Sequence, residues 1–249
     1  MVGMIFRFLL ILLMVLNVNL TSAQGTALSL NQLNKKDQKI GKWKVFHENS
    51  NQLRYVGQFE NDNPIGNFTY YYPTGELSAK MEYVNDSISF VMHYHDNGNV
   101  MGIGKFLNQQ KDSTWKMYNR QGQLIAKSFY EVGVANGLQH VFYPKNPEEG
   151  PSVVMEKYFM VDGLIDGKWQ QFFKDGSIKA SGFYSDGAKS GDFIYYLEDG
   201  TIDASGPYVN NLKHGKWYYF AGEENNASEI NYVDGETLED DDSNNIDEK

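Results

Sequence analysis

Apolar and polar residues alternate along four segments of the chain, each of which follows a glycine-containing turn. The apolar or small positions are Leu77, Ala79, Met81, Tyr83; Leu124, Ala126, Ser128, Tyr130; Ile178, Ala180, Gly182, Tyr184; and Ile202, Ala204, Gly206, Tyr208. Alternation with a period of two is typical of a half-buried β-strand. The pattern predicts strands that place these residues on one face.

A second pattern, Gly-x-aromatic-x-x-aromatic, recurs along the chain. It begins at Gly41, Gly66, Gly167, Gly191 and Gly215, with weaker copies at Ser89, Ser113 and Gly137. Successive starts differ by 25, 23, 24, 24, 30, 24 and 24 residues, and all four tryptophans occupy the first aromatic slot. This spacing indicates a tandem repeat.

Turn residues separate the apolar segments in most copies. The first turn of the unit contains a glycine seven residues after the aromatic slot, namely Gly75, Gly98, Gly122, Gly176 or Gly200. A second turn, such as Ser185–Gly187 or Val209–Asn211, leads into the next copy. Asp-Gly and Asn-Gly between apolar segments predict hairpins, because glycine adopts the positive φ that such turns need.

The unit is therefore strand, turn, strand, turn, and about eight units follow one another. Sixteen strands spaced by ~4.8 Å would form a ribbon roughly 75 Å long. We predict an all-β protein, an elongated twisted antiparallel sheet that is an open ribbon or half-pipe of about eight tandem two-stranded repeats of about 24 residues.

Aromatic residues at repeated positions are the expected core of this sheet. They are Trp43, Phe68, Trp115, Trp169, Phe193, Trp217, Tyr83, Tyr130, Tyr184 and Tyr208. Small residues recur two positions before the strand aromatic, at Gly57, Gly104, Gly182 and Gly206. We expect each glycine to leave room for a large side chain from a neighbouring strand to lie over the backbone.

Two segments, Tyr208–Phe220 and Phe183–Tyr196, carry a resemblance to a known repeat. They resemble the MORN repeat, in the variant form seen in bacterial proteins grouped with the YwqK-type antitoxins. The resemblance covers residues 41–235. It implies an elongated antiparallel ribbon or half-pipe used for protein binding, with membrane-lipid binding proposed for some members, and the antitoxin name implies neutralisation of a partner toxin.

The N-terminal 23 residues have the pattern of a signal peptide. Arg7 precedes an unbroken apolar run over Phe8–Leu16, and a more polar stretch follows. We expect cleavage between Ala23 and Gln24, because small side chains occupy the first and third positions before that bond. The apolar run is shorter than the roughly 20 residues that cross a bilayer, so we expect an exported, periplasmic or secreted protein without a membrane span after cleavage.

The remaining chain is expected to comprise a cap or linker over 24–40, the repeat array over 41–235 and an acidic disordered tail over 236–249. The protein has no cysteine, which excludes disulfides and thiolate metal sites. Its net charge is −10, with seven acids against one lysine in the tail. This charge argues against nucleic acid and against anionic lipid surfaces as partners.

No familiar catalytic spacing occurs in the sequence, so we expect a non-enzymatic protein without a cofactor. His93 and His95 lie two apart on an expected strand, and His140 lies two repeats later. They could begin a metal site, but that would need a further ligand and supporting hydrogen bonds. Partly exposed strand histidines without a metal are the favoured interpretation.

Several aromatic residues are left over once the core positions are filled: Tyr70, Tyr72, Tyr195, Tyr218 and Tyr219. We expect them to form an exposed binding surface. The tryptophan row is interpreted as core, with sugar-stacking platforms as its alternative.

A six-residue surplus around Pro144–Pro151 is either a binding loop or a tolerated insertion. The tail is either a solvated segment or a collector of calcium or of a basic partner. Function is therefore expected to be partner binding: an exported scaffold for a protein, antitoxin-like or immunity-type, with an envelope polysaccharide-binding module as the alternative and a hydrolase as the weakest hypothesis.

Overall fold

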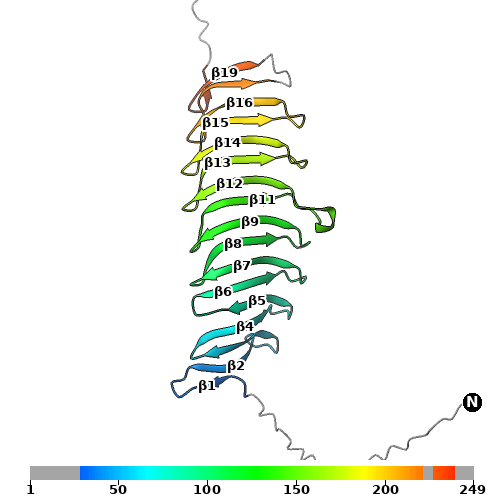
Figure 1. The fold of residues 1–249 in the computed structure, drawn as a ribbon, viewed down its shortest axis with the longest axis vertical. Helices are drawn as coiled ribbons and strands as arrows, with labels where there is room; N and C mark the ends of the chain where they lie inside the picture. Colours follow the sequence, from blue (N-terminus) through cyan, green and yellow to red (C-terminus); the bar gives the residue numbers. More distant parts are fainter. Residues whose placement is uncertain (1–28, 221–226, 239–249) are drawn as a thin grey trace, which may run out of the picture.

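The computed structural model describes residues 29–220 and 227–238, and these residues form one open antiparallel sheet of 20 strands (Figure 1). The predicted all-β ribbon of repeats is confirmed. The expected signal peptide, with its Ala23–Gln24 cleavage site, and the tail beyond residue 238 lie outside the described residues.

The strands pair in chain order, except that the two-residue strands Val134–Ala135 and Leu212–Lys213 each pair only with the strand before them, which also pairs directly with the strand after them. The first ten strands are β1 (Gln32–Leu33), β2 (Lys39–Phe46), β3 (Leu53–Glu60), β4 (Asn63–Tyr71), β5 (Leu77–Tyr83), β6 (Ile88–Tyr94), β7 (Val100–Leu107), β8 (Gln110–Tyr118), β9 (Leu124–Glu131) and β10 (Val134–Ala135). The others are β11 (Gly137–Phe142), β12 (Val154–Val161), β13 (Leu164–Phe172), β14 (Ile178–Ser185), β15 (Ala188–Tyr196), β16 (Ile202–Val209), β17 (Leu212–Lys213), β18 (Gly215–Tyr219), β19 (Ser228–Val233) and β20 (Glu236–Thr237). A short 3-10 turn, η1 (Pro147–Glu149), lies between β11 and β12.

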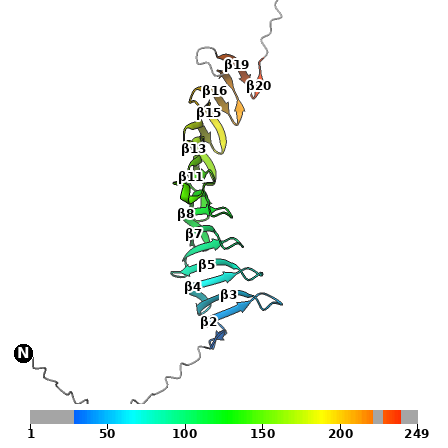
Figure 2. The same cartoon turned by 90° about the vertical axis from the view of Figure 1, so that its right-hand side faces the viewer.

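The ribbon is a single layer that twists along its long axis, as the two views at right angles show (Figures 1 and 2). β1 pairs with β2 at one end, and β20 pairs with β19 at the other. The sheet therefore begins within the segment assigned to the cap and ends within the first residues of the segment assigned to the tail. None of the described residues forms a helix long and apolar enough to cross a membrane.

The two long edges of the ribbon use different turns. On one edge, two-residue turns place both central residues at positive φ, as at Asp186 (50°) and Gly187 (82°) or Asn210 (48°) and Asn211 (71°). Such turns match the right-handed twist of the strands that they join. On the opposite edge, one glycine takes the positive φ, for example Gly176 (91°). The predicted alternation of two turn kinds is thus present.

Backbone hydrogen bonds link successive repeats along the first edge. The N–H of the second turn residue donates to a carbonyl of the preceding repeat, as from Asn211 to Lys189 (3.1 Å). The same bond recurs from Asp62 to Lys39, Gly133 to Lys111, Gly163 to Ala135, Gly187 to Ile165 and Gly235 to Lys213. In the turn Asn108–Gln109 the first residue, Asn108, donates instead, to Ser87. These bonds satisfy turn amides and fix how each repeat stacks on the last.

The opposite edge is linked by side chains. The hydroxyl of Tyr72 donates to the carbonyl of Tyr94 (2.6 Å), and the hydroxyl of Tyr143 donates to that of Phe172 (2.8 Å). His47 and His95 occupy the same repeat position and bond through Nε2 to the carbonyls of Tyr71 and Tyr118, both at 3.0 Å. Both edges of the ribbon are therefore held between repeats as well as within them.

One part of the predicted alternation is wrong at its first position. Ala180 pairs with Gln171, whereas Ile178 pairs with Phe172, because a bulge places an extra residue in β14. Since Gln171 and Phe172 point to opposite faces, Ile178 and Ala180 do so too. The same shift recurs after each glycine turn, at Leu77, Leu124 and Ile202.

Candidate functional site: the two faces of the ribbon

The aromatic slot of the repeat lies on one face of the sheet, here called the aromatic face. Phe68, Trp115, Trp169, Phe193 and Trp217 are all buried there, with between 0% and 8% of their surface exposed. Trp43, in the first repeat, is only half-buried. An open single-layer sheet therefore encloses large rings.

Four of the five enclosed rings lie over a glycine of the preceding strand, whereas Trp169 is paired with Tyr158 at that position. A Cβ atom on Gly182 would stand 2.5 Å from the ring of Phe193, and one on Gly206 would stand 2.5 Å from the ring of Trp217. Gly57 has the same relation to Phe68, and Gly104 to Trp115. The role predicted for the recurring glycine is confirmed: it lets a ring lie flat on the sheet.

The tyrosines at the ends of the alternating strands stand between these rings. The ring of Tyr208 meets Phe193 at 4.9 Å and Trp217 at 5.1 Å, edge to face in both cases. Tyr83 and Tyr184 make the same kind of contact with Phe68 and Phe193, and Tyr130 packs against the cluster around Trp115. All four are half-buried, in geometries that favour aromatic pairs.

Lysines complete the cover of the aromatic face, which sequence reasoning missed. The Nζ of Lys213 lies 4.4 Å from the ring centre of Trp217, and that of Lys189 lies 5.0 Å from Phe193. Lys39 and Lys111 stand in the same way over Trp43 and Trp115. The signal was present in the sequence, because each lysine precedes its aromatic residue by four positions. Cation–π attraction and the apolar lysine stem both favour this arrangement.

The five tyrosines expected to form one exposed binding surface do not do so. Tyr70, Tyr195 and Tyr219 lie on the aromatic face, where their hydroxyls bond to Tyr83 (3.3 Å), Tyr208 (3.3 Å) and Tyr232 (3.0 Å). Tyr72 lies at the edge and Tyr218 on the opposite face, and all five are partly buried. Burial, followed by these hydrogen bonds, raises the pKa of Tyr70 and Tyr195. The expectation failed because these tyrosines reach the tyrosines of the next strand of the same repeat.

The three histidines are separated by the fold. His93 lies on the aromatic face, since it pairs with Ala79 and Gly102, and burial lowers its pKa. His95 is engaged at the edge, and His140 lies on the opposite face beside Lys127 and Lys157. No group of three potential metal ligands occurs among the described residues.

The third repeat interrupts the aromatic face. Val91 occupies its aromatic slot, Met81 its glycine slot and Ser87 its lysine position. This repeat therefore lacks the aromatic ring, the glycine beneath it (the seat) and the lysine over it (the cover). Ser89 stands where most other repeats have the positive-φ glycine that begins the motif, such as Gly191 (72°), and the register of β5 with β6 runs without a shift. A hollow of about 600 Å³ results, lined by residues that include Tyr83, His93 and Phe106.

The fifth repeat fills its aromatic slot with a polar side chain. Gln139 is only 3% exposed. Its Nε2 donates to the carbonyls of Phe129 (3.0 Å) and Asn136 (3.0 Å), and its Oε1 accepts from the amide of Phe129 (3.2 Å). The buried amide is thereby satisfied, as the cost of burying a polar group requires.

The opposite face, here called the second face, exposes large apolar side chains. Leu138 and Phe159 are direct cross-strand partners and are 48% and 45% exposed. Phe183, two strands further on, is 53% exposed, and Phe90, in the third repeat, is 48% exposed. Exposed apolar residues that adjoin one another across strands are a candidate interaction surface.

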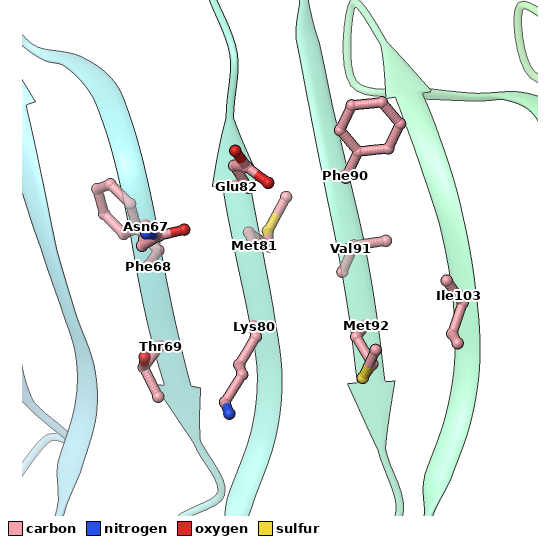
Figure 3. Close-up of a pocket in the computed structure, with 10 residues that line it drawn as sticks. All are labelled: Asn67, Phe68, Thr69, Lys80, Met81, Glu82, Phe90, Val91, Met92 and Ile103. Carbon is pink, nitrogen blue, oxygen red and sulfur yellow. The ribbon is translucent and has the colours of Figure 1, made fainter.

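A shallow hollow of about 440 Å³ opens on the second face between β4 and β7 (Figure 3). Figure 3 shows Lys80, Met92 and Ile103 side by side on three adjacent strands, which the strand register confirms. Glu82 pairs with Phe90 beside them. The hollow is lined mainly by side chains of the second face.

The insertion in the fifth repeat forms the connection from β11 to β12. Its Asn146 accepts a hydrogen bond from Gln123 of the preceding turn (2.9 Å) and donates to Glu149 (2.9 Å). The loop therefore protrudes at one edge while remaining tied to the neighbouring repeat, as Figure 1 shows. Of the acidic tail, Glu236 lies in β20, and the acids from residue 239 onward lie outside the described residues.

The fold and its faces define a repeat scaffold, and comparison with known proteins agrees. Residues 64–85 and 165–186 match the MORN repeat variant. Each matched segment begins just after a two-residue turn, Asn61–Asp62 or Asp162–Gly163, and includes a glycine turn, at Gly75 or Gly176. The chain therefore matches the MORN repeat variant at these two positions. No curated protein matches the chain.

Solved structures with some likeness include the crystal structure of TarM, at 15% identity and a TM-score of 0.30, covering 49% of this chain and 20% of that one. A mutant of S. aureus TarM in complex with fondaparinux, α-GlcNAc-glycerol and UDP has 16% identity, a TM-score of 0.30 and coverage of 49% and 21%. The Photorhabdus luminescens Tc holotoxin pore has 10% identity, a TM-score of 0.17 and coverage of 81% and 11%. The chain thus spans about a fifth of the length of the TarM chains.

Proposed function

We propose that the protein is an exported, non-enzymatic scaffold that binds a protein partner through its second face. The observation that carries the proposal is the exposed apolar stripe of Leu138, Phe159 and Phe183 on β11, β12 and β14. Water contact with such side chains is unfavourable, and covering them drives protein association. A rigid ribbon linked along both edges offers this stripe at little entropic cost.

Protein binding is preferred to binding of an envelope polysaccharide on one observation. Sugar stacking needs exposed ring faces, whereas the rings of the aromatic face are covered by tyrosines and lysines. The hydroxyls of Tyr70, Tyr195 and Tyr219 are also engaged within the sheet. Among the described residues, the most exposed rings are phenylalanines of the second face: Phe46, Phe90, Phe159 and Phe183.

The export part of the proposal rests on the N-terminal sequence pattern around Arg7 and Phe8–Leu16. Fractionation of cells that express the full chain, followed by N-terminal sequencing of the mature protein, tests it. We expect the protein outside the cytoplasm with Gln24 as its first residue. Full-length protein retained in the cytoplasm would exclude export.

The binding part is tested by affinity capture from envelope and culture-medium extracts, with the full chain compared with a Phe159→Ser, Phe183→Ser double variant. We expect one stoichiometric protein to be captured by the unaltered chain and lost by the variant, because truncation of central apolar residues is what interfaces tolerate least. Phe46→Ser, at the far end of the ribbon and 46% exposed, is the matched control. Equal capture by all three proteins would reject the second face.

Neutralisation of an exported toxin is the specific form of partner binding that the antitoxin resemblance suggests. Once a partner is captured, its toxicity to cells is measured with and without equimolar scaffold. Protection that is lost in the Phe159→Ser, Phe183→Ser variant would support this role. If the captured partner is not toxic, the scaffold role stands and the neutralising role is rejected.

A further inference from the structure

Four basic positions stand in one cross-strand row at the centre of the second face. Lys116 on β8 pairs with Lys127 on β9, Lys127 pairs with His140 on β11, and His140 pairs with Lys157 on β12. At a strand spacing of ~4.8 Å, the row is about 14 Å long. Lys168 on β13 extends the same cluster toward Phe183, which is its cross-strand partner.

Most of the other lysines in the described part of the chain lie beside a carboxylate or over an aromatic ring. Lys105 and Lys216 pair with Asp112 and Glu229, both at 2.7 Å. The lysines of the aromatic face lie over rings, as described above. Among the described residues, no carboxylate lies within salt-bridge distance of Lys116, Lys127 or Lys168. Lys157 has only the ring of Phe172, at 5.1 Å.

Like charges placed directly opposite one another destabilise a sheet. A chain with net charge −10 nevertheless places three lysines and a histidine in this row. His140 has a buried Nδ1 that meets no partner in the described part of the chain, and it borders an open hollow of about 340 Å³ with Lys157 and Phe172. Burial, and then the charges of Lys127 and Lys157, lower its pKa. Among the described residues, the arrangement leaves the lysine charges without a carboxylate and the buried Nδ1 of His140 without a hydrogen-bond partner.

Apolar side chains flank the row on both sides. Leu138 and Phe159, next to it on the same strands, are half-exposed, and Phe142 and Phe172 follow on its other side. A partner that fits this surface must bring negative charge in the middle and apolar groups beside it. Acidic protein segments that contain leucine or phenylalanine have this composition.

We propose that the row Lys116–Lys127–His140–Lys157, with Leu138 and Phe159, is the docking site for an acidic, apolar-containing segment of a protein partner. This inference rests on the proposed function, of which it specifies the partner's chemistry. A nucleic acid is disfavoured, because a polyanion longer than the row would meet the net negative charge of the rest of the chain.

The test uses fluorescence anisotropy with the full-length chain and a labelled peptide of repeating Glu-Glu-Leu, about 12 residues long so that it spans the four strands. We expect saturable binding that weakens as salt is added. Lys116→Gln with Lys127→Gln should weaken it roughly fivefold or more. Lys42→Gln with Lys80→Gln removes two exposed lysines from the same face outside the row and should leave binding unchanged.

Three outcomes would overturn the inference: no binding of the peptide, equal weakening by both double variants, or tighter binding of a single-stranded oligonucleotide than of the peptide. The proposed function is judged separately by capture of the natural partner. If capture is lost in Phe159→Ser, Phe183→Ser but survives Lys116→Gln, Lys127→Gln, the scaffold role stands and the acidic-segment proposal fails.

Discussion

The ring of Phe193 lies over the backbone of Gly182, 2.5 Å from the point at which a Cβ would stand. The two residues belong to adjacent strands, and their relation recurs at Gly206 and Trp217. It converts an open sheet, which has no second layer to pack on, into one that buries its aromatic residues against its own backbone. The glycine and aromatic residues that define the repeat in the sequence are therefore the same residues that pack its core.

Gly182→Ala is expected to destabilise the protein by roughly 1–3 kcal/mol, because the added methyl group displaces an enclosed ring. The urea midpoint measures the effect. The third repeat supplies a control, since it combines a larger residue in this slot, Met81, with a smaller one in the aromatic slot, Val91. Gly182→Ala with Phe193→Val should then lose less stability than the sum of its single changes. Strict additivity would contradict direct contact between the two positions.

Lys189→Met tests the cover of the aromatic face. The Nζ of Lys189 lies 5.0 Å from the ring centre of Phe193 and 4.8 Å from that of Tyr208. Methionine keeps the apolar stem but removes the charge, so we expect a loss of about 0.5–1 kcal/mol. Lys189→Arg should retain most of the stability. Lys42→Met changes an exposed lysine on the second face and should leave stability unchanged. An equal loss of stability in this control would mean that net charge, not the contact with the ring, causes the effect.

Tyr195 governs the response to alkaline pH. Its pKa is raised above the ordinary tyrosine value of 10.0, first by burial and then by the hydrogen bond to Tyr208. The folded protein thus holds a proton that the unfolded chain releases above pH 10, so this contribution to stability is full below that pH and declines above it. Tyr195→Phe should flatten the decline. Unfolding in urea at a series of pH values measures how the free energy of unfolding falls as the pH rises. If it falls equally steeply in the variant, Tyr195 does not cause the decline.

His93 and His140 act at the other end of the pH range. Burial lowers the pKa of both below 6.5, with nearby lysines as a second cause. Between the unfolded and the folded pKa the unfolded chain binds more protons, so stability is highest above pH 6.5 and falls as the pH drops through that window. His93→Gln should reduce this dependence of the urea midpoint, and His140→Gln should do so independently. A pH profile identical to that of the unaltered chain would contradict the prediction.

Local signals in the sequence were sufficient for the fold, but not for the surfaces. The positive φ at Gly176, the seat at Gly182 and the spacing of the tryptophans are properties of single residues and their neighbours, so they could be predicted. The face of Ile178 could not, because it depends on a bulge between strands. Nor could the burial of Tyr195, which depends on reaching the hydroxyl of Tyr208 in the next strand. The row from Lys116 to Lys157 could not be predicted either, because it depends on how four strands are paired in register.

The third repeat is expected to be the least protected part of the array. In a quasi-one-dimensional protein each repeat is stabilised mainly by its neighbours, so a repeat that lacks ring, seat and cover opens locally. Amide hydrogen exchange should be roughly tenfold faster in β6 (Ile88–Tyr94) than in the corresponding strand β15 (Ala188–Tyr196). Met81→Gly with Val91→Phe restores the seat and the ring and should slow exchange in β6. Val91→Phe alone, without its seat, should not. Equal protection of β6 and β15 in the unaltered chain would show that the backbone ladders along the two edges, rather than the seated rings, determine local stability.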